Sequence, residues 1–285
     1  MKRSDFRHLE RLRVRWAEVD LQKIVFNGHY LMYVDTAVAG YWRALAMPYH
    51  ETMEQLQGDL YVRKVTLEYL GSARYDEQLV VAIRCGRIGN SSLQFQTGIF
   101  RGEQLLVHGE LVYVFADPAT QTSKPVPPAL RELFTAYEAG ESVAEVRLGN
   151  WAELGPAARV LRHQVFAAEQ GIAADLMSDA ADEDAVHALA FNRFGLPLAS
   201  GCLLQAAPGV AKIGRMATAA SVRGAGLGAS VLRALMEQAR ARGDHEVMVH
   251  AQTSANGFYL RAGFTPHGDV FHEAGVPHQE MRRML

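Results

Sequence analysis

Cysteine, net charge and long apolar runs are all scarce in this sequence of 285 residues. The two cysteines, Cys85 and Cys202, are too few for a disulfide framework or a thiolate metal site. Charged residues or glycines interrupt the apolar runs well before the ~18 residues that a membrane-spanning helix needs. A formal net charge of −2 argues against bulk electrostatic binding to nucleic acid or anionic lipid. We therefore expect no membrane span and no nucleic-acid partner.

The N-terminal residues are basic but lack the apolar core and the small-residue cleavage site of a secretory signal, so a cytoplasmic protein is expected. Hydrophobic residues make up 49% of the chain and charged residues 21%, which is ordinary for a globular protein. At ~100–200 residues per domain, the length allows one large domain or two ordinary ones.

The first 116 residues have the hydrophobic pattern of a strand, a helix and four further strands. Leu12, Val14 and Trp16 alternate with arginines, which predicts a half-buried strand. Residues 28–46 carry apolar side chains at helical spacing on most faces, so this helix should be surrounded by protein. Four alternating stretches follow, at residues 65–69, 79–85, 93–99 and 107–115. Because their short connections favour antiparallel neighbours, we predict one curled sheet wrapped around one long helix.

A proline-rich segment and a short polar stretch separate this half from the rest. Residues 117–128 contain four of the ten prolines and lead into a helix predicted at about 128–138. The stretch 139–142 is the best domain boundary, which gives domains of residues 1–142 and 143–285. The second half alternates helices with strands, as an α/β fold does. Its helices are predicted at about 156–169, 226–241 and 255–262, and its strands at 186–192, 197–204, 210–218 and 246–251.

One acidic residue of the first half, Asp20, stands in the loop between a strand and the N-terminus of the long helix. Helix N-termini present unpaired N–H groups and a partial positive charge, which stabilise a carbonyl oxygen that develops negative charge. One carboxylate and such donors are enough to hydrolyse a thioester, because a thiolate leaves without a strong acid. An aspartate in such a loop can equally be a solvated residue or a helix cap, and spacing does not decide between them.

The first half resembles the 4-hydroxybenzoyl-CoA thioesterase family of hotdog-fold enzymes over about residues 10–138. The resemblance rests on Val14–Asp20, Tyr30–Asp35, Val62–Tyr69 and Asp117–Thr120. It implies that Asp20 is the general base or nucleophile, and that the amide polarising the thioester lies near Asn27 and Gly28. It also implies a dimer or tetramer whose active sites form at subunit interfaces.

Two positions depart from the pattern of this family. Lys23 stands three residues after the aspartate, where the family usually has glycine, and Asn27 stands where many members have histidine. Both changes bear on substrate choice and turnover. Glu18 and Asp35 are expected to be structural or electrostatic neighbours of the site.

A glycine-rich segment of the second half, Arg223–Gly228, follows a strand-like stretch and opens a long helix. Its glycines let consecutive N–H groups point at one anion, and the helix dipole adds to the attraction, so a pyrophosphate is the natural guest. An ordinary loop and helix start have the same appearance. The glycine spacing does not fit a dinucleotide fingerprint, and no Gly-Lys-Ser/Thr follows, which excludes a P-loop.

The second half resembles the GNAT acyltransferase superfamily over about residues 143–285. The pattern Arg-x-x-Gly-x-Gly from Arg223 carries the resemblance, together with Gly214–Thr218 and Asn256–Phe264. It implies an acyl-CoA site without a metal, in which the pantetheine arm pairs with the main chain of β-strand residues and Asn256 helps to hold the cofactor or the turn. The main-chain residues implied are Met216, Ala217 and Thr218. The residues implied around the pyrophosphate are Arg223, Gly224, Ala225, Gly226, Leu227, Gly228 and Ala229, with Ala225 replacing a lysine of many relatives.

The same resemblance makes Tyr259 the acid that protonates the departing thiolate. A phenol with an ordinary pKa of ~10 is protonated at neutral pH, which is the state that this role requires. The base that deprotonates an amine is not evident from the sequence. His250, Glu246, His187 and His278 all remain candidates, and His272 and His278 lack a third ligand for zinc.

Together these patterns predict a two-domain α+β chain, a hotdog fold followed by a GNAT α/β fold. The expected function is bifunctional: acyl-CoA hydrolysis in the first domain, and acetyl-CoA-dependent acylation of an unidentified amine in the second. In one alternative the GNAT domain only binds acetyl-CoA and regulates the thioesterase. In another the hotdog domain only builds the homo-oligomer.

Overall fold

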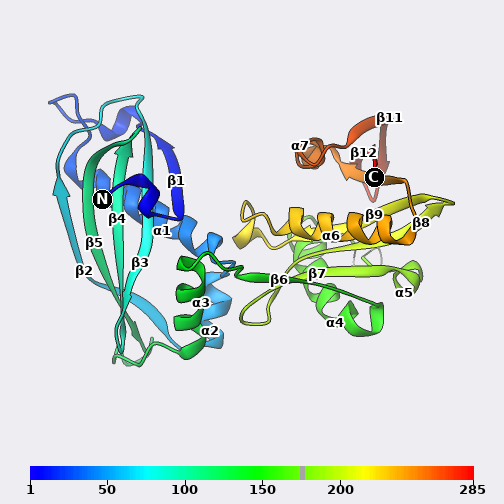
Figure 1. Cartoon of the computed structure of the whole chain (residues 1–285), viewed down its shortest axis with the longest axis horizontal. Helices are drawn as coiled ribbons and strands as arrows, with labels where there is room; N and C mark the ends of the chain where they lie inside the picture. The colour runs from blue at the N-terminus through cyan, green and yellow to red at the C-terminus, as the bar shows by residue number, and fades with distance from the viewer. Residues whose placement is uncertain (174–176) are drawn as a thin grey trace. The chain divides into compact units, whose positions relative to one another are not determined.

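The computed structural model describes residues 1–173 and 177–285. They form two compact units, Met1–Val143 and Ala144–Leu285 (Figure 1). Across these described residues, no helix combines the length and the apolar character needed to cross a bilayer.

The first unit is a five-stranded antiparallel sheet with one long helix against it. The strand order is β1-β3-β4-β5-β2. The strands are β1 (His8–Arg13), β2 (Asp59–Tyr69), β3 (Gln78–Ile88), β4 (Ser92–Arg101) and β5 (Gln104–Ala116). The helices are α1 (Asn27–Ala44), α2 (Tyr49–Gln55) and α3 (Pro128–Glu138). The predicted arrangement of one sheet around one helix is confirmed, and Figure 1 shows α1 running along the curved strands.

The core of this unit forms between α1 and the sheet. Val34, Ala37 and Tyr41 recur at helical spacing and are fully buried. The ring of Tyr41 lies 5.8 Å from that of Phe95 on β4 and 6.1 Å from that of Phe134 on α3. The helix is therefore enclosed by sheet on one side and by α3 on another, as its apolar faces predicted.

One local prediction for the first unit is wrong, and one helix was missed. The first strand was expected to include Leu12, Val14 and Trp16, but β1 ends at Arg13 and Trp16–Glu18 forms a 3-10 turn. The turn forms because the Glu18 carboxylate accepts the backbone N–H of Arg15 at 2.7 Å. The helix α2 was not predicted, since its seven residues are too short for a clear periodicity.

The second unit is a seven-stranded sheet in the order β11-β12-β10-β9-β8-β7-β6. The strands are β6 (Ala144–Gly149), β7 (Val186–Asn192), β8 (Pro197–Ala207), β9 (Val210–Thr218), β10 (Glu246–Gln252), β11 (Thr265–Glu273) and β12 (Val276–Met284). The helices are α4 (Trp151–Arg162), which continues as a π-helix over His163–Glu169, α5 (Ala181–Asp184), α6 (Leu227–Arg242) and α7 (Asn256–Arg261). Short 3-10 turns occupy Ala220–Val222 and Thr253–Ala255 of this unit, and Arg3–Asp5 of the first unit.

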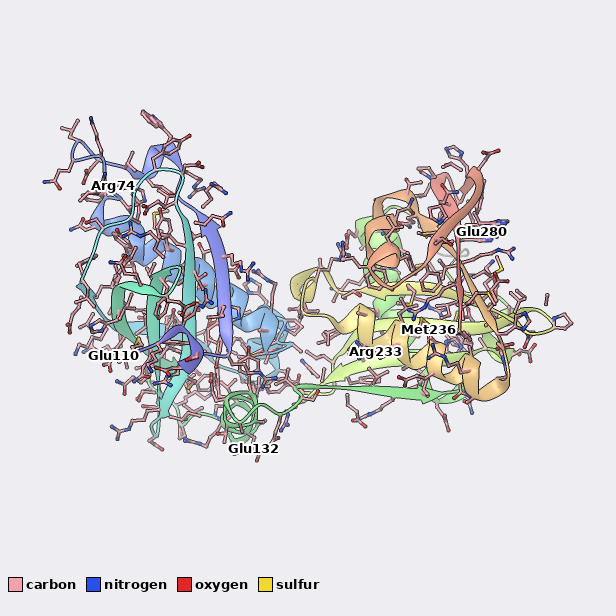
Figure 2. All side chains as sticks on the ribbon, turned by 45° about the horizontal axis from the view of Figure 1, so that its top comes forward. Arg74, Glu110, Glu132, Arg233, Met236 and Glu280 are labelled. Carbon is pink, nitrogen blue, oxygen red and sulfur yellow. The ribbon has the colours of Figure 1, made fainter. Side chains whose placement is uncertain are left out.

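The helix α6 shows how one sequence pattern builds the core of this unit. Val231 and Leu235 are fully buried on the face that contacts the sheet, and Met236 lies beside them. Arg233 on the same helix is exposed, and Figure 2 labels Met236 and Arg233. The predicted helix at about 226–241 is therefore confirmed.

The helix predicted at about 156–169 begins five residues earlier than expected, at Trp151. Asn150 accepts the N–H of Glu153 at 3.0 Å, and the Glu153 carboxylate accepts the N–H of Asn150, which is a capping box. The C-terminal part changes to π-helical geometry from His163. The strands β6, β11 and β12 were not predicted, and β11 is largely exposed, so its sequence carries little hydrophobic alternation.

The strands β9 and β10 run parallel but diverge along their length. Their register joins Val210–Ile213 to Glu246–Val249. Beyond these residues β10 remains paired with β12, and β9 remains paired with β8. Within the described part of the chain, the edge of Gly214–Thr218 that faces away from β8 therefore has no strand beside it.

Candidate functional sites

In the first unit, Asp20 begins a tight turn that leads from the 3-10 turn to α1. The N–H of Lys23 donates to the carbonyl of Asp20, and the N–H of Asp20 donates to the carbonyl of Ile24, both at 2.9 Å. Lys23 has φ of 61°, the left-handed conformation that glycine adopts most readily. The backbone thus keeps the conformation that suits a glycine here, although the side chain is lysine.

The carboxylate of Asp20 is half-buried and partly committed to this turn. Its Oδ1 accepts the N–H of Gln22 at 2.8 Å. Among residues 1–173 and 177–285, no other group forms a hydrogen bond or an ion pair with this carboxylate. Oδ2 is therefore available to a water molecule or a substrate.

Glu18 fixes the start of this segment against α1. Its buried carboxylate accepts the hydroxyl of Tyr33 at 2.6 Å and the Nε–H of Arg15 at 2.6 Å. Burial by itself would raise the pKa of Glu18, but the hydrogen bonds from Tyr33 and Arg15 outweigh it and lower the pKa. The carboxylate of Glu18 is thus a structural anchor for the loop, and its carbonyl accepts the N–H of Phe26 at 2.9 Å.

The first turn of α1 carries Asn27 and Gly28, directly after the Asp20 turn. Phe26, at the N-cap, provides no side-chain acceptor for the N–H groups of this turn. The hydroxyl of Tyr69 on β2 donates to the carbonyl of Asn27 at 3.2 Å. The aspartate and the helix N-terminus named from the sequence are thus held on one short segment, anchored at Glu18.

The surface around this segment is unusually apolar. Trp16, Phe26, Met32, Tyr69 and Tyr75 are all exposed. The rings of Trp16 and Tyr75 pack edge to face at 5.4 Å, which brings the 3-10 turn and the segment after β2 together. Exposed apolar patches of this kind mark interaction sites.

In the second unit, the glycine-rich segment forms an open loop at the N-terminus of α6. Gly224 and Gly226 have φ of 89° and 85°, and a Cβ on either would meet no atom within 4 Å. Gly226 is the N-cap of α6, so the N–H groups of Leu227 and Gly228 lie in its first turn. The N–H of Ala225 donates to the carbonyl of Val222 at 3.2 Å, so this N–H already has a hydrogen-bond partner within the protein.

The guanidinium of Arg223 forms hydrogen bonds with other residues of the protein. Its guanidinium makes two hydrogen bonds to the carboxylate of Glu169, at 2.5 and 2.6 Å, and donates to the carbonyl of Thr218 at 3.1 Å. The hydrogen bonds from Arg223 lower the pKa of Glu169. Arg223 therefore joins the end of the π-helix to the end of β9.

The remaining residues named for acyl-CoA lie beside this loop. Met216, Ala217 and Thr218 occupy the diverging end of β9, and a Cβ on Gly228 would lie 3.0 Å from Oγ1 of Thr218. The N-terminus of α6 thus approaches the free end of β9. Oδ1 of Asn256 is buried and has no hydrogen-bond partner in the described residues, so a ligand N–H would satisfy it.

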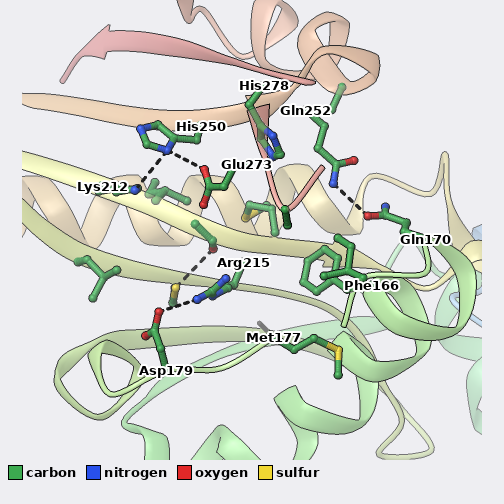
Figure 3. Close-up of a pocket in the computed structure, with 18 of the residues that line it drawn as sticks. Phe166, Gln170, Met177, Asp179, Lys212, Arg215, His250, Gln252, Glu273 and His278 are labelled. Carbon is green, nitrogen blue, oxygen red and sulfur yellow. Dashed lines mark hydrogen bonds and ion pairs between the residues drawn. The ribbon is translucent and has the colours of Figure 1, made fainter. Parts of the chain in front are cut away.

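The diverging strands open into a pocket on the sheet (Figure 3). Its walls include Gly214 and Met216 of β9, Phe166 of the π-helix, and Tyr259 of α7. The ring of Tyr259 packs against that of Phe264 at 5.6 Å, and burial raises the pKa of its hydroxyl well above the ordinary value. The phenol stays protonated at neutral pH while it faces the pocket.

The four candidates for the base occupy different environments. His187 is fully buried and bonds through Nε2 to the carbonyl of Asp182 at 2.8 Å, and burial lowers its pKa. Glu246 pairs with Arg282 at 3.2 Å and does not line the pocket. His250 and His278 do line it (Figure 3).

Two acidic side chains of the pocket are already paired, which the sequence did not reveal. Asp182 is buried and forms an ion pair with buried Arg162 at 2.9 Å. Asp179 pairs with Arg215 at 2.8 Å. In the described residues, no group of three or more His, Cys, Asp or Glu side chains is arranged to hold a metal ion.

These features define two kinds of site on two kinds of fold: an acidic turn before the central helix of a hotdog-like sheet, and a splayed sheet with an open glycine loop. A family model described as "Thioesterase superfamily" matches residues 22–108, and one described as "Acetyltransferase (GNAT) domain" matches residues 200–285. The chain therefore contains a thioesterase-superfamily domain and a GNAT domain, and both resemblances drawn from the sequence are confirmed.

Individual proteins similar to this chain come from both groups. The "Uncharacterized N-acetyltransferase YjcF" of Bacillus subtilis is 28% identical over 124 residues, which are 43% of this chain and 87% of that protein. A putative N-acetyltransferase from Lactobacillus plantarum is 30% identical, with a TM-score of 0.48, over 50% of this chain and 99% of that one. The 1,4-dihydroxy-2-naphthoyl-CoA thioesterase Slr0204 from Synechocystis is 13% identical, with a TM-score of 0.42, over 45% of this chain and 95% of that one.

Proposed function

We propose that the chain is a bifunctional enzyme of CoA thioesters. The first unit hydrolyses acyl-CoA, and the second transfers the acetyl group of acetyl-CoA to an amine. Both families use CoA thioesters as substrates, which supports one shared carrier for the two units. The observation that carries the proposal is the end of β9 after Ile213, where β10 no longer runs beside it, next to an open glycine loop and a pocket that Tyr259 lines.

In the second unit, each part of acetyl-CoA has a complementary feature. The pantetheine amides would pair with Met216–Thr218 as an added strand, which satisfies the backbone groups of the free edge. The pyrophosphate would meet the open loop at Gly224 and Gly226 and the first N–H groups of α6. Tyr259 would donate its proton to the thiolate as the C–S bond breaks. A primary amine entering the pocket would accept the acetyl group.

Substitutions in this unit should separate binding from catalysis. Gly226→Ala places a Cβ in the open loop at a positive φ, so the dissociation constant for CoA should rise at least about tenfold, since one hydrogen bond to a charged group contributes ~1.5–3 kcal/mol. Tyr259→Phe should leave that constant unchanged and slow transfer to amines by about 10²-fold. Calorimetry with CoA and thiol-release kinetics with acetyl-CoA and a panel of primary amines measure the two effects.

Gly243→Ala is the matched control, because Gly243 also has a positive φ, 96°, with open space around it, and it caps the other end of α6. It should cost stability without weakening CoA binding. An unchanged rate in Tyr259→Phe contradicts the role of the phenol. Tight CoA binding by the wild type without transfer to any amine favours the alternative, in which the GNAT domain binds acetyl-CoA as a regulatory module.

In the first unit, the arrangement supports hydrolysis of an acyl-CoA thioester. The free Oδ2 of Asp20 would activate water or attack the carbonyl carbon. The N–H groups of Asn27 and Gly28 at the start of α1 would stabilise the negative charge on the carbonyl oxygen. Lys23 keeps the turn closed in a conformation suited to glycine, so this departure from the family pattern leaves the position of Asp20 intact.

Asp20→Asn tests this role with little disturbance of the loop. The amide oxygen of asparagine can still accept the N–H of Gln22, so the turn should persist while the charge and the basicity are lost. Thiol release from acyl-CoA without an amine should fall by about 10²-fold. Glu132→Gln, at an exposed glutamate on α3, is the control and should keep the rate. Unchanged hydrolysis in Asp20→Asn supports a hotdog unit that only builds the oligomer.

We also propose that the first unit assembles a homo-oligomer, a dimer or tetramer. The strand β2 is an edge of the sheet and exposes Tyr61, Val62 and Tyr69. An unpaired apolar edge is a template for another strand. This surface lies next to the carbonyl of Asn27, which Tyr69 contacts, so association would enclose the candidate site.

Sedimentation velocity of the full chain at micromolar concentration should show a dimer or larger species. Val62→Lys places a charge on the β2 edge and should shift the chain towards monomer. Val160→Lys, at a similarly exposed valine on α4, should not change the sedimentation coefficient. A wild-type chain that sediments as a monomer at all concentrations contradicts the proposal.

A further inference from the structure

Four ionisable side chains gather on one wall of the second unit's pocket, each from a different strand. They are Lys212 of β9, His250 of β10, Glu273 of β11 and His278 of β12 (Figure 3). Nδ1 of His250 lies 3.0 Å from Oε2 of Glu273 and 3.4 Å from Nζ of Lys212. This wall belongs to the same pocket as Tyr259, so the cluster and the phenol face one volume.

The carboxylate of Glu273 can only accept, so its 3.0 Å contact with Nδ1 of His250 favours the tautomer with a proton on Nδ1 over the opposite tautomer, which the longer 3.4 Å contact with Nζ of Lys212 requires. When Nδ1–H donates to the carboxylate, Nε2 keeps its lone pair. Across residues 1–173 and 177–285, no group forms a hydrogen bond with Nε2 of this histidine. The ring also packs edge to face on Phe271, with centroids 4.9 Å apart, which limits its rotation. The imidazole is therefore held with a proton acceptor available to the pocket.

Glu273 is suited to support a positive charge on this imidazole. Burial alone would raise the pKa of Glu273, but the hydrogen bond from His250 and the neighbouring charges of His250, Lys212 and His278 outweigh it and lower the pKa. Glu273 is thus ionised at neutral pH. A carboxylate bonded to Nδ1–H both fixes the tautomer and stabilises the imidazolium that forms when Nε2 takes a proton.

The other bases of the wall are less suited to the task. The N–H of His278 at Nδ1 donates to the carbonyl of Val276 at 2.8 Å, so a neutral group supports its ring instead of a carboxylate. Asp179 and Asp182 are paired with arginines, as described above. His250 therefore combines a free acceptor nitrogen with an anionic partner.

We propose that His250 is the general base of acetyl transfer and that Glu273 is its positioning residue, an assignment that rests on the proposed amine acylation. The nitrogen of a neutral primary amine attacks the thioester carbonyl carbon and forms the C–N bond. One N–H proton passes to Nε2 of His250. The C–S bond breaks with its electron pair on sulfur, and Tyr259 gives its proton to the thiolate. Proton return from His250 to Tyr259 through solvent restores both groups.

This assignment names the acceptor class as amines that must lose a proton to react. When the neutral amine attacks, its nitrogen becomes positively charged and must lose a proton before the C–S bond can break, so the reaction needs a base beside that nitrogen. The groups that face His250 from neighbouring strands are Lys212, Glu273, His278 and Glu280, and their charges enter the pH dependence with it.

The test uses the full chain with acetyl-CoA and a panel of primary alkylamines, arylalkylamines and amino acids. His250→Gln should lower kcat for the best acceptor by about 10²-fold and remove the acidic limb of the pH profile of kcat/KM. Glu273→Gln should give a smaller fall in kcat with KM for the amine unchanged. Both variants should bind CoA as the wild type does, which shows that the site remains folded.

His245→Gln is the matched control, and His278→Gln tests the other histidine of the pocket wall. His245 is exposed and directly precedes β10, whereas His250 lies near the end of this strand. The His245→Gln variant should therefore keep the wild-type rate and pH profile. A wild-type pH profile in His250→Gln overturns the assignment, and a selective loss in His278→Gln transfers the role to that histidine. A wild-type chain that acetylates no amine of the panel contradicts the proposed function itself, so the two failures are distinguishable.

Discussion

The proposed acetyl-CoA site depends on one backbone constraint, the divergence of β9 from β10. Parallel pairing ends at Ile213 and Val249, and within the described residues no strand lies beside the rest of β9 on the side away from β8. Backbone N–H and C=O groups at such a position need partners from solvent or from a ligand. The pantetheine arm of CoA is an extended chain with amide groups, so it can pair with this edge of β9 as an added strand.

Both units use the start of a helix in a comparable way. In the first, Glu18 anchors a tight turn so that Asp20 stands just before the uncapped N-terminus of α1. In the second, two glycines with positive φ carry the chain into α6 and leave open space above the loop. Each arrangement leaves N–H groups and the positive end of a helix dipole at the site, where the proposed function places an electrophilic or anionic part of acyl-CoA.

Regular periodicity predicted most of the fold. The long helix α1 and the strands β3 to β5 have strict apolar patterns because one sheet face and most helix faces are buried. Elements without such burial were missed, including exposed β11 and the short helix α2. The first strand was misplaced because Val14 and Trp16 continue its alternation, while the side chain of Glu18 ends the strand by capping a turn.

The candidate site residues were found through motifs rather than through periodicity. Asp20, Tyr259 and the glycines of the loop stand at fixed spacings, so local sequence identifies them. The partnership of His250 with Glu273 joins two residues that are 23 positions apart on different strands, and nothing local relates the two positions. Likewise, the bond from Arg223 to Glu169 spans 54 residues, so only the folded chain reveals that Arg223 is committed to a carboxylate.

Residue-resolved amide hydrogen exchange of the full chain, with and without CoA, tests the central claim most directly. CoA should slow exchange at the amides of Met216–Thr218 that point away from β8, and in the first turn of α6. Amides of Val210–Ile213, already paired on both sides, should change little. CoA that binds without altering exchange at Met216–Thr218 would contradict the account, because the carrier would then lie elsewhere than beside the free edge of β9.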